Sequence, residues 1–178
     1  GPNSQTPLKI AQLYLALARD GSAPAPALAR DVEIQNTWAL DLDPEHIESL
    51  REGLKRVTAP GGTAHFSTAL EYWDVRGKTG TAEHAQSQAG LAEPHAWFAG
   101  MAGPFNGPPG IVVVVIIEHG ESGSTAAAPV MAKTADYYLR REHGIPIDSI
   151  QTYLEHVQIG PVPLWYQERY PGRFSNIR

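Results

Sequence analysis

A lysine and two threonines interleaved with glycines form the stretch of this sequence best suited to chemistry, Gly77-Lys78-Thr79-Gly80-Thr81. The lysine ammonium offers only hydrogen-bond donors and each threonine hydroxyl can donate and accept, so Lys78, Thr79 and Thr81 suit a carboxylate ligand. A glycine inside a strand often marks close approach by a ligand or another backbone, and a side chain at Gly80 would obstruct that approach. The stretch therefore predicts a carboxylate-binding strand, with an ordinary edge strand that exposes its lysine as the alternative interpretation.

Three antiparallel strands are expected to carry and flank this stretch. The first covers residues 73–83, and after a polar loop at 85–94 a second strand covers residues 95–101. A turn rich in proline and glycine at 104–110 predicts a hairpin to a third strand at 111–118. Because the third strand is apolar on both faces, we expect it to be central in the sheet and covered on both sides.

Two helices are predicted before the strands. Thr6 followed by Pro7 is a typical helix start, and Asp43 followed by Pro44 repeats the same signal. Between these helices, residues 22–29 are expected to form an extended loop. The apolar positions of the second helix recur at helical spacing and are expected to be buried: Ile47, Leu50, Leu54 and Val57.

Further helices are predicted around and after the strands. A short one covers 63–70, and a longer one begins at Ser124 or Thr125 and ends near residue 141. One face of the longer helix is marked by Val130, Thr134 and Tyr138. Helices that precede and follow a run of antiparallel strands predict an α+β fold class.

Composition narrows the functional classes. The 178 residues include 14 basic and 19 acidic side chains, a net charge of −5 without a basic cluster, which argues against nucleic acid as a partner. The absence of cysteine excludes disulfides and thiol catalysis. Glu118 and His119 end the third strand beside a glycine turn and are candidates for a ligand cleft, with a plain strand end as the alternative. The seven histidines contain no His-x-x-x-His pair, so we expect no metal site: His46, His65, His84, His95, His119, His143 and His156.

Four stretches in order resemble the C-terminal half of a penicillin-binding-protein transpeptidase domain. They are Thr6-Pro7-Leu8-Lys9-Ile10-Ala11, Pro60-Gly61-Gly62-Thr63-Ala64, Lys78-Thr79-Gly80-Thr81-Ala82, and His95-Ala96-Trp97-Phe98-Ala99-Gly100 with the apolar strand, glycine turn and helix that follow. The Lys-Thr-Gly triplet is a motif of β-lactamases and penicillin-binding proteins. The His-Ala-Trp-Phe strand looks most like the class B, elongation-type (penicillin-binding protein 2) branch.

The resemblance implies a role for each residue of the lysine-threonine stretch. Lys78, Thr79, Gly80 and Thr81 would bind the C-terminal carboxylate of a D-alanyl-D-alanine stem peptide, or that of a β-lactam. The peptide would lie along the strand as an added β-strand. The backbone N–H of Thr81 would be one of two oxyanion-hole donors. The full enzyme would cross-link peptidoglycan by D,D-transpeptidation through a serine acyl-enzyme, without a metal or organic cofactor.

The nucleophile of that family is absent from these 178 residues. None of the nine serines has lysine three positions later or asparagine two positions later, so the Ser-x-x-Lys and Ser-x-Asn motifs are both missing. We therefore expect residues 1–143 to be the C-terminal part of a transpeptidase domain and 144–178 a C-terminal tail. The chain alone should be inactive, and should either pair with a chain that carries the first half or self-associate.

Location and partners also follow from the resemblance. It implies an extracytoplasmic domain at the periplasmic face of the bacterial inner membrane, anchored by a segment not in this chain, with a membrane glycan polymerase as partner. Two alternatives stay open: a serine β-lactamase fragment, and a non-catalytic penicillin-binding-like binding or scaffold module. The nearest match to the β-lactamase Glu-x-x-x-Asn segment, Glu33-Ile34-Gln35-Asn36, is one residue too short, which favours a transpeptidase.

Overall fold

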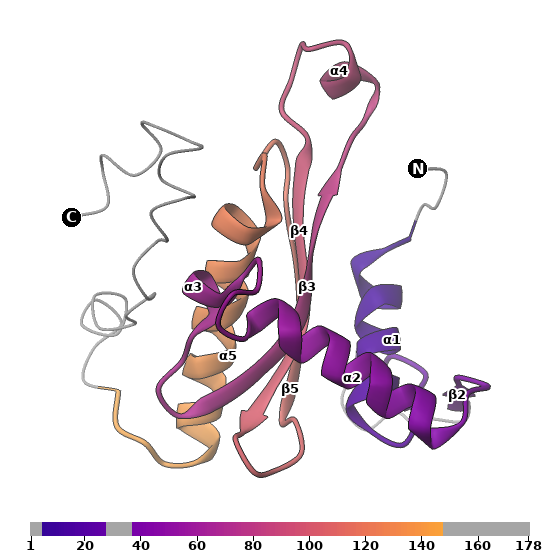
Figure 1. Ribbon diagram of the computed structural model, residues 1–178, viewed down its shortest axis with the longest axis vertical. Coiled ribbons are helices and arrows are strands. Elements are labelled where there is room, and N and C mark those ends of the chain that lie inside the picture. Colours follow the sequence, from indigo (N-terminus) through magenta and orange to yellow (C-terminus); the bar gives the residue numbers. More distant parts are fainter. Residues whose placement is uncertain (1–4, 28–36, 148–178) are drawn as a thin grey trace.

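A three-stranded antiparallel sheet forms the middle layer of the computed structural model, which describes residues 5–27 and 37–147 (Figure 1). Its strands are β3 (Trp73–Ala82), β4 (His95–Pro104) and β5 (Ile111–Ile117), in the order β3-β4-β5. Helices cover both faces, which confirms the predicted α+β class. The β3–β4 hairpin rises above the rest of the described chain, and its tip carries the one-turn helix α4 (Ala85–Gln88) where a loop was predicted.

The prediction that the third strand is central was wrong for the described residues. β4 is central, and β5 pairs only with β4, with Ala96 opposite Ile117 and Ala102 opposite Ile111. Helices α1 and α5 nevertheless pack on the two faces of β5. A strand covered on both faces is apolar throughout, so the pattern correctly indicated the cover but not the position in the sheet.

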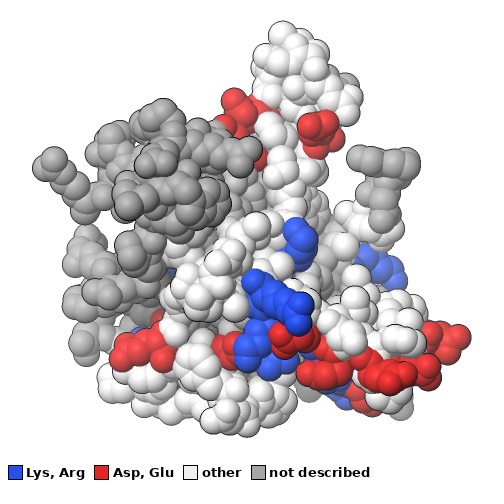
Figure 2. Space-filling model, viewed as in Figure 1, with Lys and Arg blue, Asp and Glu red and all other residues white. Residues whose placement is uncertain are grey.

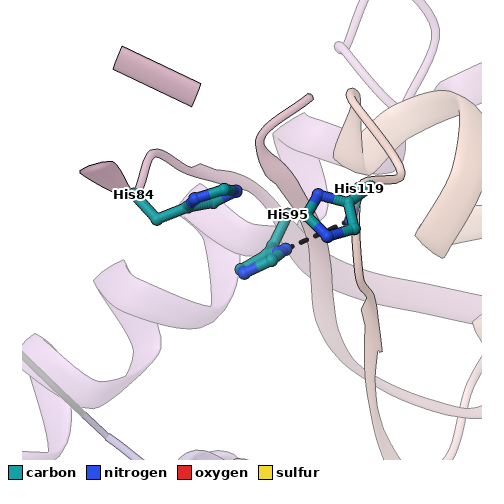
Figure 3. Close-up of side chains that lie close together, drawn as sticks. All are labelled: His84, His95 and His119. Carbon is teal, nitrogen blue, oxygen red and sulfur yellow. Dashed lines mark hydrogen bonds between the residues drawn. The ribbon is translucent and has the colours of Figure 1, made fainter. Parts of the chain in front are cut away.

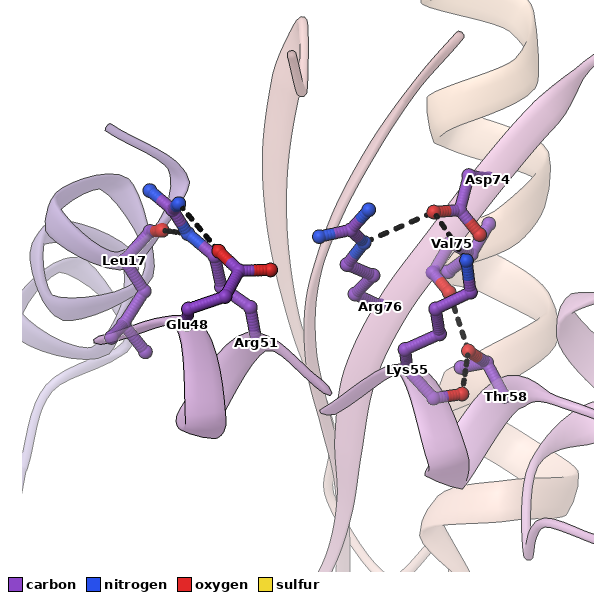
Figure 4. Close-up of polar contacts among 8 residues, drawn as sticks. All are labelled: Leu17, Glu48, Arg51, Lys55, Thr58, Asp74, Val75 and Arg76. Carbon is purple, nitrogen blue, oxygen red and sulfur yellow. Dashed lines mark hydrogen bonds and ion pairs between the residues drawn. The ribbon is translucent and has the colours of Figure 1, made fainter. Parts of the chain in front are cut away.

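Helices α1 (Pro7–Ala18) and α2 (Pro44–Thr58) form the layer on one side of the sheet. α1 begins as predicted, because Thr6 Oγ1 accepts a hydrogen bond of 3.3 Å from the Lys9 amide. α2 contacts the C-terminal end of α1, where Arg51 Nε donates to the Leu17 carbonyl at 2.6 Å (Figure 4). Arg51 Nη2 also donates to the Arg19 carbonyl. A cation at a helix C-terminus satisfies free carbonyls and complements the helix dipole.

α2 also holds β3 in place. The Thr58 hydroxyl donates to the Val75 carbonyl, and Asp74 lies 3.9 Å from Lys55 Nζ and 3.0 Å from Arg76 Nε (Figure 4). On the surface, basic side chains (blue) lie at the centre of the view in Figure 2, beside a group of acidic side chains (red) over α2. One ion pair, between Lys55 and Asp74, and one buried hydrogen bond, between Thr58 and Val75, thus join α2 to the first half of the strand that carries the lysine-threonine stretch, and the pair between Asp74 and Arg76 lies within the strand itself.

Two apolar cores lie on opposite faces of the sheet. One joins the sheet to α5 and includes Phe98, Met131 and Leu139. The other joins it to α1 and α2 and includes Leu17, Ile47, Met101 and Tyr14, the last with its pKa raised to about 12 by burial. On α2, Leu54 and Val57 are partly buried as predicted, whereas Leu50 is 46% exposed.

Several of the remaining elements begin or end at other residues than predicted. β1 (Ser22–Pro24) pairs with β2 (Thr37–Ala39), so part of the predicted loop is a short strand. The predicted helix at 63–70 is reduced to α3 (His65–Thr68). The long helix starts with a π-helical turn, η1 (Gly123–Ala127), and continues as α5 (Ala128–Glu142).

Some expectations lie outside the described residues. They are the Glu33–Asn36 segment and the tail beyond residue 147. In the part of the chain that the structure describes, no helix has the length and apolar character needed to cross a bilayer.

Candidate substrate-binding strand

The lysine-threonine stretch lies on β3, at an edge of the described sheet. β4 occupies one side of β3, and no strand among the described residues pairs with the other side. Lys78 is exposed, and its Nζ donates to the Thr79 carbonyl at 2.8 Å and approaches Thr79 Oγ1 at 3.4 Å. Among the described residues no carboxylate lies within ion-pair distance of Lys78. Its ammonium is therefore available to an anionic ligand.

The predicted ligand side chains do not share one face of the sheet. Lys78 pairs with Ala99, which belongs to the core under α1 and α2, whereas Thr79 pairs with Phe98, which belongs to the core under α5. Because side chains alternate along a strand, Thr81 follows Thr79. The two faces of the sheet are both accessible from the open edge of β3, where the Lys78 side chain contacts the Thr79 oxygens. A ligand that contacts all three residues must therefore lie along this edge.

Glycines allow the π-helical turn η1 to pack directly on the backbone of β3. A Cβ atom at Gly123 would lie 2.3 Å from the Trp97 carbonyl oxygen and 2.6 Å from the Gly80 carbonyl oxygen, closer than real Cβ contacts. A Cβ atom at Gly80 would lie 3.2 Å from Trp97 Cβ. The structure thus gives Gly80 a packing reason to be glycine, and clearance for a ligand stays a prediction. Gly123 lies in the glycine turn after the third strand, and its part in this contact was not predicted.

Replacing Gly123 by alanine is expected to lower the free energy of unfolding by about 1–3 kcal/mol, because the new methyl group must displace η1 from two backbone carbonyls. The matched control is Gly53→Ala in α2, where an added Cβ meets nothing within 4 Å. That change should stabilise the helix by about 0.5–1 kcal/mol. Urea unfolding of both variants tests the contrast, and equal stabilities would show that η1 does not depend on this contact.

Three histidines that are far apart in the sequence lie together at the same end of the sheet (Figure 3). His84 follows β3, His95 begins β4 and His119 follows β5. Their ring centroids are 4.5 Å apart for His84–His95, 5.3 Å for His84–His119 and 5.2 Å for His95–His119. The spacing rule for paired histidines missed this cluster. The predicted hairpins could have revealed it, because consecutive antiparallel strands alternate direction and bring these ends together.

The fold and the site together define a class of protein. The penicillin binding protein transpeptidase domain family matches residues 1–136. The chain belongs to this family, which confirms the resemblance seen in its four sequence stretches.

Individual relatives place the chain near penicillin-binding protein 2. It is 31% identical over 157 residues to the peptidoglycan D,D-transpeptidase MrdA of Haemophilus influenzae, covering 76% of this chain and 24% of that protein. The Pseudomonas aeruginosa PBP2 structure is 30% identical with a TM-score of 0.63, over 83% of this chain and 32% of that one. Penicillin-binding protein A of M. tuberculosis, solved as an imipenem acyl-enzyme, is 25% identical with a TM-score of 0.56, over 77% and 32%. The chain thus spans about a quarter to a third of these relatives.

Proposed function

We propose that this chain supplies the substrate-binding strand of a D,D-transpeptidase that cross-links peptidoglycan stem peptides through a serine acyl-enzyme. The observation that carries the proposal is a Lys78 ammonium at the open edge of β3 that has no ion-pair partner among the described residues, in a chain of the transpeptidase family. A ligand carboxylate would replace the contacts that Lys78 now makes with Thr79, and charge-assisted hydrogen bonds of this kind are about twice as strong as neutral ones.

The backbone of β3 supplies the second part of the proposed site. A peptide that adds to the open edge would hydrogen-bond to the outward N–H and C=O groups of the strand, so its direction and register would be fixed. Backbone groups of residues two apart point to the same edge of a strand. The Thr79 carbonyl accepts from Lys78, and by this alternation the Thr81 N–H would point to the same edge. This amide is our candidate for one oxyanion-hole donor, which stabilises charge as it develops on the attacked carbonyl.

The nucleophile of the proposed reaction comes from residues outside this sequence. No serine among the 178 residues belongs to a Ser-x-x-Lys or Ser-x-Asn motif. Lys78 and Thr81 can bind and polarise a substrate but cannot form the acyl-enzyme, so this chain alone is expected to be inactive. In the proposed reaction an amine of a second stem peptide, rather than water, resolves the acyl-enzyme. That choice separates a transpeptidase from a serine β-lactamase.

Substrates, location and partners complete the proposal. The stem-peptide carboxylate and the carboxylate of a β-lactam carry the same charge and would use the same contacts to Lys78, Thr79 and Thr81. The domain would act at the periplasmic face of the bacterial inner membrane, with a membrane glycan polymerase of the elongation machinery as partner. Residues 1–143 would form the C-terminal part of the transpeptidase domain and 144–178 a tail.

Fluorescent penicillin tests the division of labour between this chain and the nucleophile. The intact protein should be labelled, and peptide mass mapping should place the label on a serine outside residues 1–178. Label on a serine within this chain would contradict the assignment. An absence of labelling would favour a non-catalytic binding module, and rapid turnover of a chromogenic cephalosporin would favour a β-lactamase.

A further inference from the structure

We propose that His84, His95 and His119 form a binding site for a zinc ion. Each histidine offers one ring nitrogen, and these three atoms all lie within 4.8 Å of one another. Zn²⁺ binds imidazole nitrogen at about 2.0–2.1 Å, so the nitrogens of a tetrahedral site are about 3.4 Å apart. Small rotations of three partly exposed rings can therefore bring the nitrogens to the distance that one ion requires.

A single backbone carbonyl orients two of the rings. His84 Nε2 lies 3.2 Å and His119 Nδ1 lies 3.0 Å from the Glu93 carbonyl oxygen. A carbonyl oxygen only accepts, so both of these nitrogens carry the proton. The opposite nitrogen of each ring, in its neutral form, then carries the lone pair that a metal ligand needs. Histidine ligands commonly donate their second N–H to a backbone carbonyl in this way.

The His95 ring is held by a hydrogen bond that would break when a zinc ion binds. The His119 backbone N–H donates to His95 Nδ1 at 3.1 Å, so His95 now presents a protonated Nε2 (Figure 3). Ligation of an ion by either nitrogen of His95 requires this bond to break. The site is therefore close to, but not already in, a coordinating arrangement.

The backbone at the end of β5 adopts an unusual conformation beside the histidine cluster. His119 has φ of 54° and Glu121 has φ of 68°, both in the left-handed region that residues other than glycine rarely adopt. Such a conformation is unfavourable for residues that carry a Cβ atom. Backbone strain of this kind concentrates at functional sites. Here it places the His119 ring beside the other two histidines.

The chemical setting fits zinc rather than a hard cation. Imidazole suits Zn²⁺ and related transition metals, whereas Mg²⁺ and Ca²⁺ prefer oxygen ligands. Glutamates adjoin the cluster in the sequence at positions 83, 93 and 118, and Figure 2 shows acidic side chains on both sides of the hairpin below its tip. Within the described residues the cluster has three protein ligands, which leaves the fourth position of a tetrahedral ion for water or an added ligand.

A zinc ion would tie the ends of β3, β4 and β5 together, three residues beyond Thr81. This inference does not depend on the proposed transpeptidase activity, because it concerns metal binding by the histidines themselves. A metal assay that fails would leave penicillin labelling unaffected, and the reverse also holds.

Metal analysis of the intact protein, produced without a polyhistidine tag, tests the site. After equilibration with Zn²⁺ and removal of excess ion, we expect about one zinc per chain. Cobalt substitution should give the visible absorption bands of a tetrahedral ion with nitrogen ligands. The variants His84→Gln, His95→Gln and His119→Gln each remove a ligand and should weaken zinc binding by more than the roughly 10- to 100-fold that loss of a ligand's outer-shell partner costs. The matched control is His46→Gln, an exposed histidine on α2.

The variants must also remain folded in the absence of zinc, which circular dichroism and thermal melting of the metal-free proteins establish. Stoichiometric zinc that is lost in the three cluster variants and retained in His46→Gln supports the site. Wild-type protein without bound zinc, cluster variants that keep full affinity, or equal loss in the His46 variant each overturn it.

Discussion

Replacing Lys78 by alanine in the intact protein is expected to slow acylation by penicillin by about 10- to 100-fold. A hydrogen bond to a charged group contributes about 1.5–3 kcal/mol, and each 1.4 kcal/mol corresponds to a factor of ten. Lys78 is exposed, and its hydrogen bonds within the described part of the chain go to the neighbouring Thr79, so its removal takes little from the fold. The loss should therefore fall on ligand binding and acylation, with the melting temperature unchanged.

A second lysine provides the control for charge alone. Lys55 is also exposed and lies on α2, where its Nζ is 3.9 Å from Asp74. Lys55→Ala removes one positive charge from the same protein, but its expected effect on acylation is small, because Lys55 lies on α2 away from the strand edge and a long ion pair with a half-exposed lysine contributes about 0–1 kcal/mol to stability. Stopped-flow acylation rates separate the two variants. Unchanged acylation in Lys78→Ala would remove this residue from the site.

Local signals in the sequence were sufficient for the elements that carry the site. Thr6 before Pro7 and Asp43 before Pro44 each start a helix at the predicted residue, because helix caps act through neighbours in the chain. The hairpin between β4 and β5 follows from a proline-glycine turn for the same reason. The Lys78 stretch could therefore be placed on a strand from sequence alone.

Burial was harder to predict, because it depends on the packing of distant elements. The α5 face marked by Val130, Thr134 and Tyr138 is the exposed one, and the neighbouring face with Met131, Ala135 and Leu139 is buried. Helical periodicity indicated which residues share a face but not which face is buried. The buried face includes a carboxylate at position 136, and the exposed face includes two large apolar side chains. Hydrophobicity alone therefore does not identify the buried side of this helix.

The histidine cluster shows the same limit at a candidate site. His84 and His119 are 35 positions apart in the sequence, and a spacing rule based on one helix or one turn does not connect them. Strand order and register bring them together, with Ala82 opposite His95 and Ala96 opposite Ile117. Sites assembled from several strand ends require the topology to be known first.

Replacing Arg140 by methionine is expected to lower the free energy of unfolding by about 3–5 kcal/mol, because it leaves a buried carboxylate without its cation. Asp136 on α5 is 2% exposed. Its Oδ1 accepts a hydrogen bond of 2.6 Å from Trp73 Nε1 on β3, and Arg140 Nε approaches both carboxylate oxygens at 3.0–3.1 Å. The Arg140 guanidinium also lies over the Tyr72 ring, 4.7 Å from its centre.

The adjacent residue on the same helix provides the matched control. Arg141→Met removes the same charge and keeps a similar side-chain volume, but Arg141 is exposed and its guanidinium lies 5.9 Å from the centre of the Tyr137 ring. The Arg141→Met change should lower the free energy of unfolding by less than about 1 kcal/mol. Asp136 and Trp73 connect α5 to the start of β3, so the Arg140 variant should also weaken the docking of the helix on the sheet. Urea unfolding monitored by tryptophan fluorescence measures both effects, and equal stabilities of the two arginine variants would show that the Asp136 carboxylate does not need its partner.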